Sequence, residues 1–141
     1  MSEFTKTFRN LTLAGARRAR DAALAEAAKL GVAICVVIVD RAGLLLLVET
    51  QDGAAPGSVE ASLMKAKGAA RYRVATHKTA EFVKTLSPGL VSHALSLPEV
   101  CAFQGGVPLQ VQGETVGAVG ISGGSGEQDV AIGQAAAAAL G

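Results

Sequence analysis

The residues of this sequence that could bind a ligand or move a proton gather near its C-terminal end. Ser122, Gly123 and Gly124 begin the stretch SGGSGEQD, which also contains Glu127 and Asp129. The N–H groups of a glycine-rich turn can bind an anion at the start of a helix, and a carboxylate beside them can act as a general acid or base. The same residues also suit an ordinary strand-to-helix turn, in which the helix dipole stabilises acidic side chains in the first turn of the helix. Both interpretations stay open on these residues alone.

Histidine chemistry is limited to two positions, His77 and His93. No HxH, HxxxH or His/Cys cluster is present, so we do not expect a dedicated zinc or non-haem iron site. No GxSxG motif is present either, which argues against a serine hydrolase. A single histidine can ligate haem iron, and either His77 or His93 could do so. The alternative is that both histidines are ordinary surface or hydrogen-bonded residues.

A second source of functional groups is a basic stretch, which holds Lys65, Lys67, Arg71 and Arg73. A solvated helix face is the usual interpretation of such a run. In the functional alternative, Lys65 or Arg71 reaches a carboxylate of a ligand, or Glu127 or Asp129 across a pocket. An acid–base enzyme would then use His77, Glu127 or Asp129 to move the proton.

Two strands must position the C-terminal glycine-rich stretch. Residues 107–111 alternate apolar and polar side chains, and Gly113-Glu114 falls where a two-residue hairpin turn belongs. Residues 116–121 form a nearly apolar second strand. Gly117 and Gly120 interrupt it, which indicates that another backbone or a ligand approaches closely. Ser125 and Gln128 have the spacing of a capping box, so a helix should follow over residues 128–140.

The remaining pattern predicts one domain that mixes helices with a sheet. We expect an N-terminal arm (1–10), strands over 32–39 and 44–49, and a short helical or irregular segment over 90–97. Three helices should follow the caps Thr12, Ser58 and Thr76 and run to about residues 30, 74 and 86. The strand over 32–39 is apolar on both faces, so it should lie centrally in the sheet. Cys35 and Cys101 match no metal or redox spacing and should be buried free thiols.

Composition excludes several classes of protein. Half of the 141 residues are hydrophobic, only 18% are charged, and the net charge is +1, so the chain should fold and should not bind nucleic acid. No apolar run is long enough to span a bilayer, and the polar N-terminus predicts a cytoplasmic protein without membrane contact. Many small residues and few charges favour a homo-oligomer.

Three stretches resemble one known family: GGVPLQVQGETVGAVGISGGSGEQD at residues 105–129, VVIVDRAGLLLLVETQDGA at 36–54 and KAKGAARYRVAT at 65–76. They are similar to the GlcG/HbpS-like family, which includes the C-terminal domain of PduO-type corrinoid adenosyltransferases. The resemblance extends over residues 11–141. It implies an α/β (α+β) fold, a single profilin-like or PAS-like domain with an antiparallel sheet flanked by helices, assembled as a homo-oligomer.

The resemblance also directs the functional hypotheses. Some family members bind haem or a corrinoid, so we expect a small-molecule pocket near Lys65, Arg71, Thr76 and His77 and the Ser122–Asp129 loop. No histidine lies on the first helix, where a family member has its axial haem ligand. Of the two histidines, His77 is the preferred axial-ligand candidate, because it follows Thr76, which matches the family motif. The alternative to a binding module is a cofactor-independent lyase or isomerase that acts on a small oxygenated metabolite. A third hypothesis is an accessory protein that serves only subunit contacts.

Overall fold

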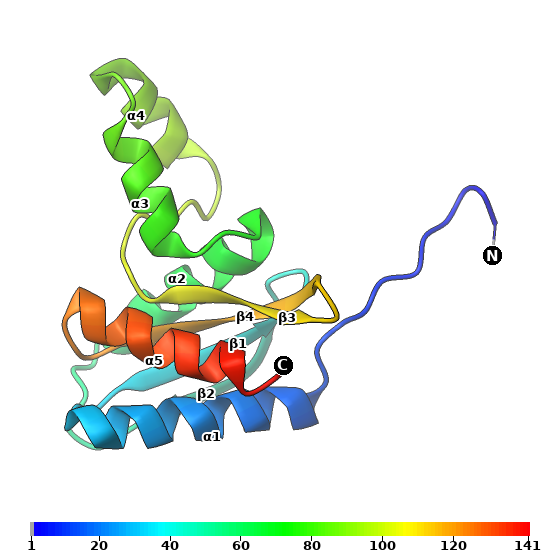
Figure 1. Ribbon diagram of the computed structural model, residues 1–141. Coiled ribbons are helices and arrows are strands. Elements are labelled where there is room, and N and C mark those ends of the chain that lie inside the picture. The colour runs from blue at the N-terminus through cyan, green and yellow to red at the C-terminus, as the bar shows by residue number, and fades with distance from the viewer. Residues whose placement is uncertain (1) are drawn as a thin grey trace.

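The structure is a computed structural model that describes residues 2–141. Its elements follow one another as α1 (Leu13–Leu30), β1 (Cys35–Asp40), β2 (Leu45–Thr50), α2 (Ser58–Tyr72), α3 (Thr76–Lys84), α4 (Pro88–Ser96), β3 (Gly106–Val111), β4 (Glu114–Ser122) and α5 (Gly126–Ala138) (Figure 1). Together they form one α+β domain, which confirms the predicted fold class. None of the helices in these residues is both long and apolar enough to cross a membrane.

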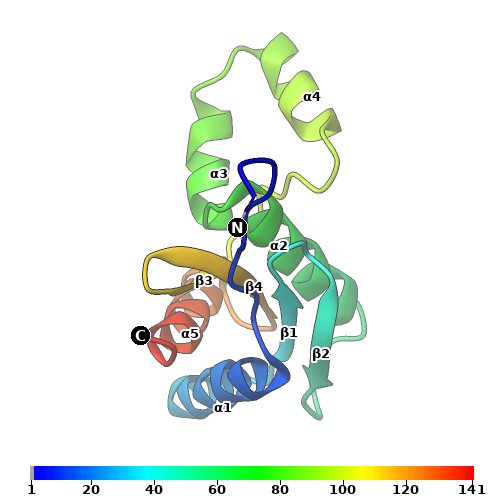
Figure 2. The same ribbon diagram turned by 90° about the vertical axis from the view of Figure 1, so that its right-hand side faces the viewer.

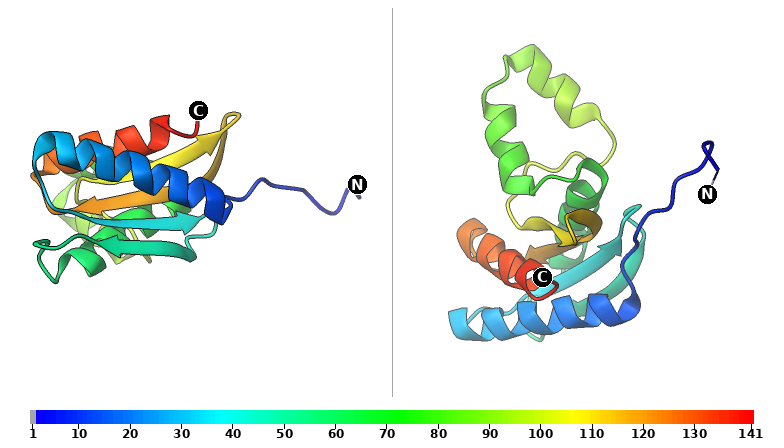
Figure 3. Two further views of the ribbon diagram at one scale, coloured as in Figure 1. Left: turned by 90° about the horizontal axis from the view of Figure 1, so that it is seen from below. Right: turned by 45° about the vertical axis from the view of Figure 1, so that its right-hand side comes forward.

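The sheet has four antiparallel strands in the order β2-β1-β4-β3. All six residues of β1 are buried, so this strand is central, as its apolar run predicted. Its side chains alternate between two cores. Val36 and Ile38 pack with α1 and α5 on one face, whereas Val37 and Val39 pack with α2 on the other. Seen from below, α1 and α5 lie together over the same face of the sheet (Figure 3).

Two glycines in β4 allow other backbone segments to approach closely: Gly120 makes room for α2, and Gly117 makes room for β1. A Cβ atom added at Gly120 would overlap the carbonyl oxygen of Ser62 in α2, and one at Gly117 would overlap the carbonyl oxygen of Val39. The close backbone approach that these two glycines predicted is therefore confirmed. Because the alanines at the inner face of α2 are also small, the functional groups of α2 are brought directly over β4.

Most element boundaries differ by one to three residues from the sequence-based expectation, and three of these differences bear on the site. The hairpin turn is Gln112-Gly113, one residue earlier than expected, because both residues have positive φ (52° and 77°) and Glu114 already pairs with Val111. This combination is that of a type I′ turn. Helix α5 begins at Gly126, two residues early, although the Ser125–Gln128 capping box is present as predicted. Helix α2 begins at Ser58 itself, with Gly57 as its N-cap.

Two segments extend from the body of the domain. Helices α3 and α4 project together from one end, and the N-terminal segment runs away in an extended form (Figures 1 and 2). The base of that segment is fixed, because Arg9 pairs with Glu114 at 3.0 Å and Leu11 N–H donates to the carbonyl oxygen of Val116. Cys35 and Cys101 are buried and free, as expected.

Candidate functional site

A cleft of about 540 Å³ lies where α2, α3, the segment before β3 and the β4–α5 loop meet. Its lining residues are Ala61, Lys65, Ala80, Lys84, Ala102, Phe103, Gln104, Ser122, Gly124, Gly126 and Asp129. Four residues singled out from the sequence are among them: Lys65, Ser122, Gly124 and Asp129. The cleft therefore brings together residues from α2 and from the glycine-rich loop that lie about sixty positions apart.

Lys65 is a buried lysine whose ammonium group ends at the base of this cleft. Its Nζ donates to the carbonyl oxygen of Ile121 at 2.7 Å and to Oδ2 of Asp129 at 3.3 Å. The side chains of Lys65 and Asp129 are only 8% and 5% exposed. An ammonium group has three N–H donors. Among residues 2–141 the third donor of Lys65 has no partner within hydrogen-bonding distance, so it is available to an oxygen atom of a ligand.

Asp129 connects this lysine to the glycine-rich loop. It lies in the first turn of α5, and its Oδ1 accepts a hydrogen bond from Gly124 N–H at 2.9 Å. Burial raises the pKa of the Asp129 carboxyl, whereas the Gly124 N–H and the charge of Lys65 act in the opposite direction and are outweighed. The carboxyl therefore keeps its proton to higher pH than an exposed aspartate does, as suits a general acid or base.

Two glycines that the sequence analysis did not select make room for this pair. Gly105 has φ of +122°, and a Cβ atom there would lie 3.0 Å from Cβ of Asp129 and 3.2 Å from Cδ of Lys65. A Cβ atom at Gly106 would overlap the carbonyl group of Lys65 itself. The signal in the sequence was the glycine pair Gly105-Gly106, directly before the strand predicted over residues 107–111.

Thr76 and His77 lie beside the cleft and do not line it. Thr76 is buried, and its hydroxyl accepts from Gly106 N–H at 2.8 Å, which ties α3 to β3. His77 is partly buried, and its Nδ1 is shielded from solvent without a hydrogen-bond partner among the described residues. It precedes Ala80 by three positions and Lys84 by seven, so it lies on the face of α3 that carries both cleft residues.

Three other predicted site residues lie outside the lining. Arg71 is exposed and pairs with Glu99 at 3.1 Å. Glu127 is exposed in the first turn of α5. Gly123 allows the chain to turn, since a Cβ atom there would overlap the carbonyl oxygen of Ala33. Of the proposed acid–base residues His77, Glu127 and Asp129, only Asp129 lines the cleft.

The sequence analysis missed the contribution of α3 and of the segment before β3. Lys84, Phe103 and Gln104 line the cleft, yet no motif surrounds them. Lys84 could have been found by its helical spacing from His77. Phe103 and Gln104 lie in a segment without regular structure, so periodicity gives no signal for them.

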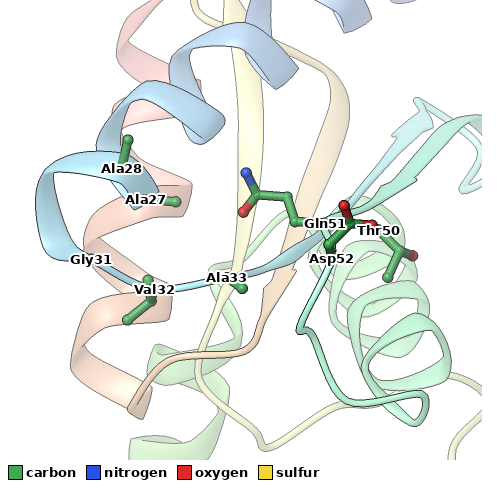
Figure 4. Close-up of a pocket in the computed structure, with 8 residues that line it drawn as sticks. All are labelled: Ala27, Ala28, Gly31, Val32, Ala33, Thr50, Gln51 and Asp52. Atoms are coloured by element: carbon green, nitrogen blue, oxygen red, sulfur yellow. The ribbon is translucent and has the colours of Figure 1, made fainter.

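Other hollows offer less chemistry. A pocket of about 620 Å³ lies where α1 ends, and Asp52 is the charged side chain in its lining (Figure 4). Gln51 in that pocket is already engaged, because its Oε1 accepts from Ile34 N–H at 3.0 Å. A groove of about 480 Å³ beside α3 and α4 is lined mainly by apolar residues. Nowhere in residues 2–141 do three or more His, Cys, Asp or Glu side chains come together as metal ligands would.

Comparison with known proteins decides the family. Residues 11–138 match the model of the family described as "Haem degrading protein HbpS-like". The chain belongs to this HbpS-like family. It is 36% identical over 122 residues to a 15.0 kDa protein of Citrobacter freundii, encoded between dhaT and dhaS, and the match covers 84% of each chain. Relationship to the GlcG and PduO proteins, which the sequence motifs suggested, is thereby confirmed.

Solved structures of HbpS-like proteins have the same fold. The ORFY protein of Klebsiella pneumoniae superposes with a TM-score of 0.89 at 31% identity, over 99% of this chain and 96% of that one. The complex named PduOC:Heme superposes with a TM-score of 0.82 at 35% identity, over 93% and 95% of the two chains. The relative PduOC therefore forms a complex with haem.

Proposed function

We propose that this chain is a small-molecule-binding domain and that its ligand occupies the cleft above Lys65 and Asp129. The observation that carries the proposal is the buried ammonium of Lys65, held by the Ile121 carbonyl and by Asp129 with one N–H unused. A buried charge is costly unless fixed partners surround it. Because Ile121 and Asp129 hold the ammonium group of Lys65 in one orientation, its remaining N–H is positioned to bind a ligand oxygen. The cleft also lies within the usual size range of small-molecule pockets.

Haem is the first ligand to test, because a relative forms a haem complex. Haem iron in proteins takes His, Cys, Met or Tyr as its axial ligand. The described lining of the cleft contains none of these, and α1 has no histidine. His77, on the cleft-bearing face of α3, is the candidate: its Nδ1 has no hydrogen-bond partner among the described residues, but it is shielded from solvent and outside the lining, so iron binding would require α3 to move. His77 would hold the iron, Lys65 and Lys84 would face the carboxylates, and bound haem would supply redox chemistry.

The test is a titration of the purified protein with haemin, followed by absorbance, with His77→Ala and His93→Ala in parallel. His93 is the matched control, because it is exposed on α4 away from the cleft. We expect a saturable, sharpened Soret band that is lost in His77→Ala and kept in His93→Ala. An absorbance change that never saturates would contradict specific haem binding. Loss of the Soret band only in His93→Ala would identify His93 of α4 as the axial ligand. Cobalamin is titrated in the same way, since corrinoid binding is the other cofactor expectation.

A second candidate function is acid–base catalysis without a cofactor, by a lyase or an isomerase. The raised pKa of Asp129 beside a lysine in a cleft favours it, because such a carboxyl holds its proton to higher pH than an ordinary aspartate and can act as a general acid or base. Lys65 would stabilise a developing enolate, while His77 and Glu127 would have no direct contact with the substrate. A screen of hydroxy- and keto-acids tests this function. If Asp129 acts as a base, the rate increases with pH through its raised pKa and is lost in Asp129→Asn.

Self-association is a separate proposal. The projecting α3–α4 unit exposes large apolar side chains, namely Phe82, Leu90, Leu95 and Leu97. Large exposed apolar side chains gathered on one small unit are typical of protein interfaces. Sedimentation velocity of the intact chain checks this expectation, and a monomer at all accessible concentrations would contradict it.

A further inference from the structure

The charges of the cleft lining do not balance, and Lys84 is the reason. The charged members of the lining are Lys65, Lys84 and Asp129. Lys65 and Asp129 form an ion pair with each other. Lys84 lies in the last turn of α3, is exposed, and forms no ion pair with any residue of the described chain. The lining therefore has one uncompensated positive charge, and its position is that of Lys84.

The apolar part of the lining consists of small groups, apart from a single aromatic ring. Ala61, Ala80 and Ala102 contribute only methyl groups, and Gly124 and Gly126 contribute backbone. Phe103 is the aromatic side chain of the cleft, and it is 71% exposed. Burying a phenylalanine is worth about 1.5–3 kcal/mol, so an exposed ring beside a cleft is well suited to cover a ligand. Aromatic rings prefer offset-stacked or edge-to-face contacts with other rings.

We propose that Lys84 and Phe103 determine the ligand class, which is a planar unsaturated ring that bears a carboxylate. Phe103 contacts the ring, Lys84 pairs with the carboxylate, and Lys65 donates to a ligand oxygen. This inference rests on ligand binding in the cleft, as proposed above, but not on haem or on an axial ligand. It favours acids over their amides, and thus carboxylate-bearing porphyrins over corrinoids whose side chains are amidated.

The experiment uses a matched pair of probes, indole-3-acetate and indole-3-acetamide, which differ in charge at one position. The chain contains no tryptophan, so indole fluorescence anisotropy reports bound probe directly. Wild-type protein should bind the acid more tightly than the amide. In Lys84→Gln that preference should shrink by about two- to fivefold, the range for a solvent-exposed ion pair. Lys78→Gln is the control, because Lys78 is on the same helix but lines the apolar groove.

Phe103→Ala should weaken the binding of acid and amide equally, by about three- to tenfold, because it removes a ring contact and no charge. Phe103→Tyr should restore both affinities. An unchanged acid-to-amide ratio in Lys84→Gln would overturn the role of Lys84. Unchanged affinities in Phe103→Ala, together with a smaller assembly in sedimentation velocity, would instead place Phe103 in a subunit contact and overturn its role.

The haemin titration separates the failure of this inference from the failure of the proposed function. If haemin does not bind but the indole pair shows the Lys84 dependence, haem is the wrong ligand and the ligand class stands. If haemin binds wild type, Lys84→Gln and Phe103→Ala with equal affinity, the binding function stands and the inference is wrong. If wild type binds neither indole probe nor haemin, both are wrong.

Discussion

Replacing Lys65 by methionine removes the charge at the base of the cleft while keeping an unbranched chain of similar length. Two groups then lose a partner. The carbonyl oxygen of Ile121 loses its 2.7 Å hydrogen bond, and Asp129 loses its only ion pair within residues 2–141. Leaving one buried polar group unsatisfied costs about 1–3 kcal/mol. Breaking a buried ion pair costs about 3–5 kcal/mol when the remaining charge cannot be neutralised.

The remaining charge can be neutralised here, and this makes the cost depend on pH. Burial already raises the pKa of Asp129 from its ordinary value of 3.8, and Lys65 opposes that rise. In Lys65→Met the pKa should therefore rise further. Above the ordinary value, the folded variant keeps a proton that the unfolded chain has released, so its stability falls with pH until its own pKa is passed. Each additional unit of pKa costs about 1.4 kcal/mol.

We therefore expect Lys65→Met to lose about 1 kcal/mol near pH 4 and about 3 kcal/mol at pH 8. Urea unfolding of wild type and variant across this pH range measures the difference. Lys67→Met is the control on the same helix. Its side chain is 36% exposed and lies 3.7 Å from Glu99, so its loss should cost less than about 1 kcal/mol at every pH. A cost of Lys65→Met that stays constant or shrinks with increasing pH would refute the reasoning.

Three further predictions concern the groups around the cleft. Gly120→Ala should lower the free energy of unfolding by about 3 kcal/mol in urea, because its Cβ atom would overlap a carbonyl of α2, whereas Gly57→Ala, which meets no atom, should change it by less than about 0.5 kcal/mol. Thr76→Val should cost about 1–3 kcal/mol in thermal unfolding by leaving Gly106 N–H unpaired, and Thr76→Ser should be nearly neutral. Burial raises the pKa of the Cys101 thiol, so a thiol reagent at pH 8 should label it only after unfolding, and rapid labelling of the native protein would contradict this.

Local patterns predicted most of the fold because each depended on neighbouring residues. The capping box at Ser125 and Gln128 is present. The apolar run over residues 32–39 forms most of β1, which is fully buried and central in the sheet. The hairpin turn was misplaced by one residue, because Gln112 adopts positive φ and allows a type I′ turn that glycine position alone did not reveal. Such a choice depends on the register of β3 against β4, which is a long-range property.

For the site, the sequence by itself determined which residue types were available: a lysine in a small-residue helix, a carboxylate in a helix start and a glycine-rich turn. It could not decide which lysine or arginine meets which carboxylate. Lys65 contacts Asp129, while Arg71, six residues later and on another face of the helix, contacts Glu99, because the helix face over β4 is fixed by the glycines that let α2 approach. The tertiary structure alone brought Lys84 and Phe103 to the same cleft, since their spacing along the chain carries no period and only the packing of α3 against the sheet places them together.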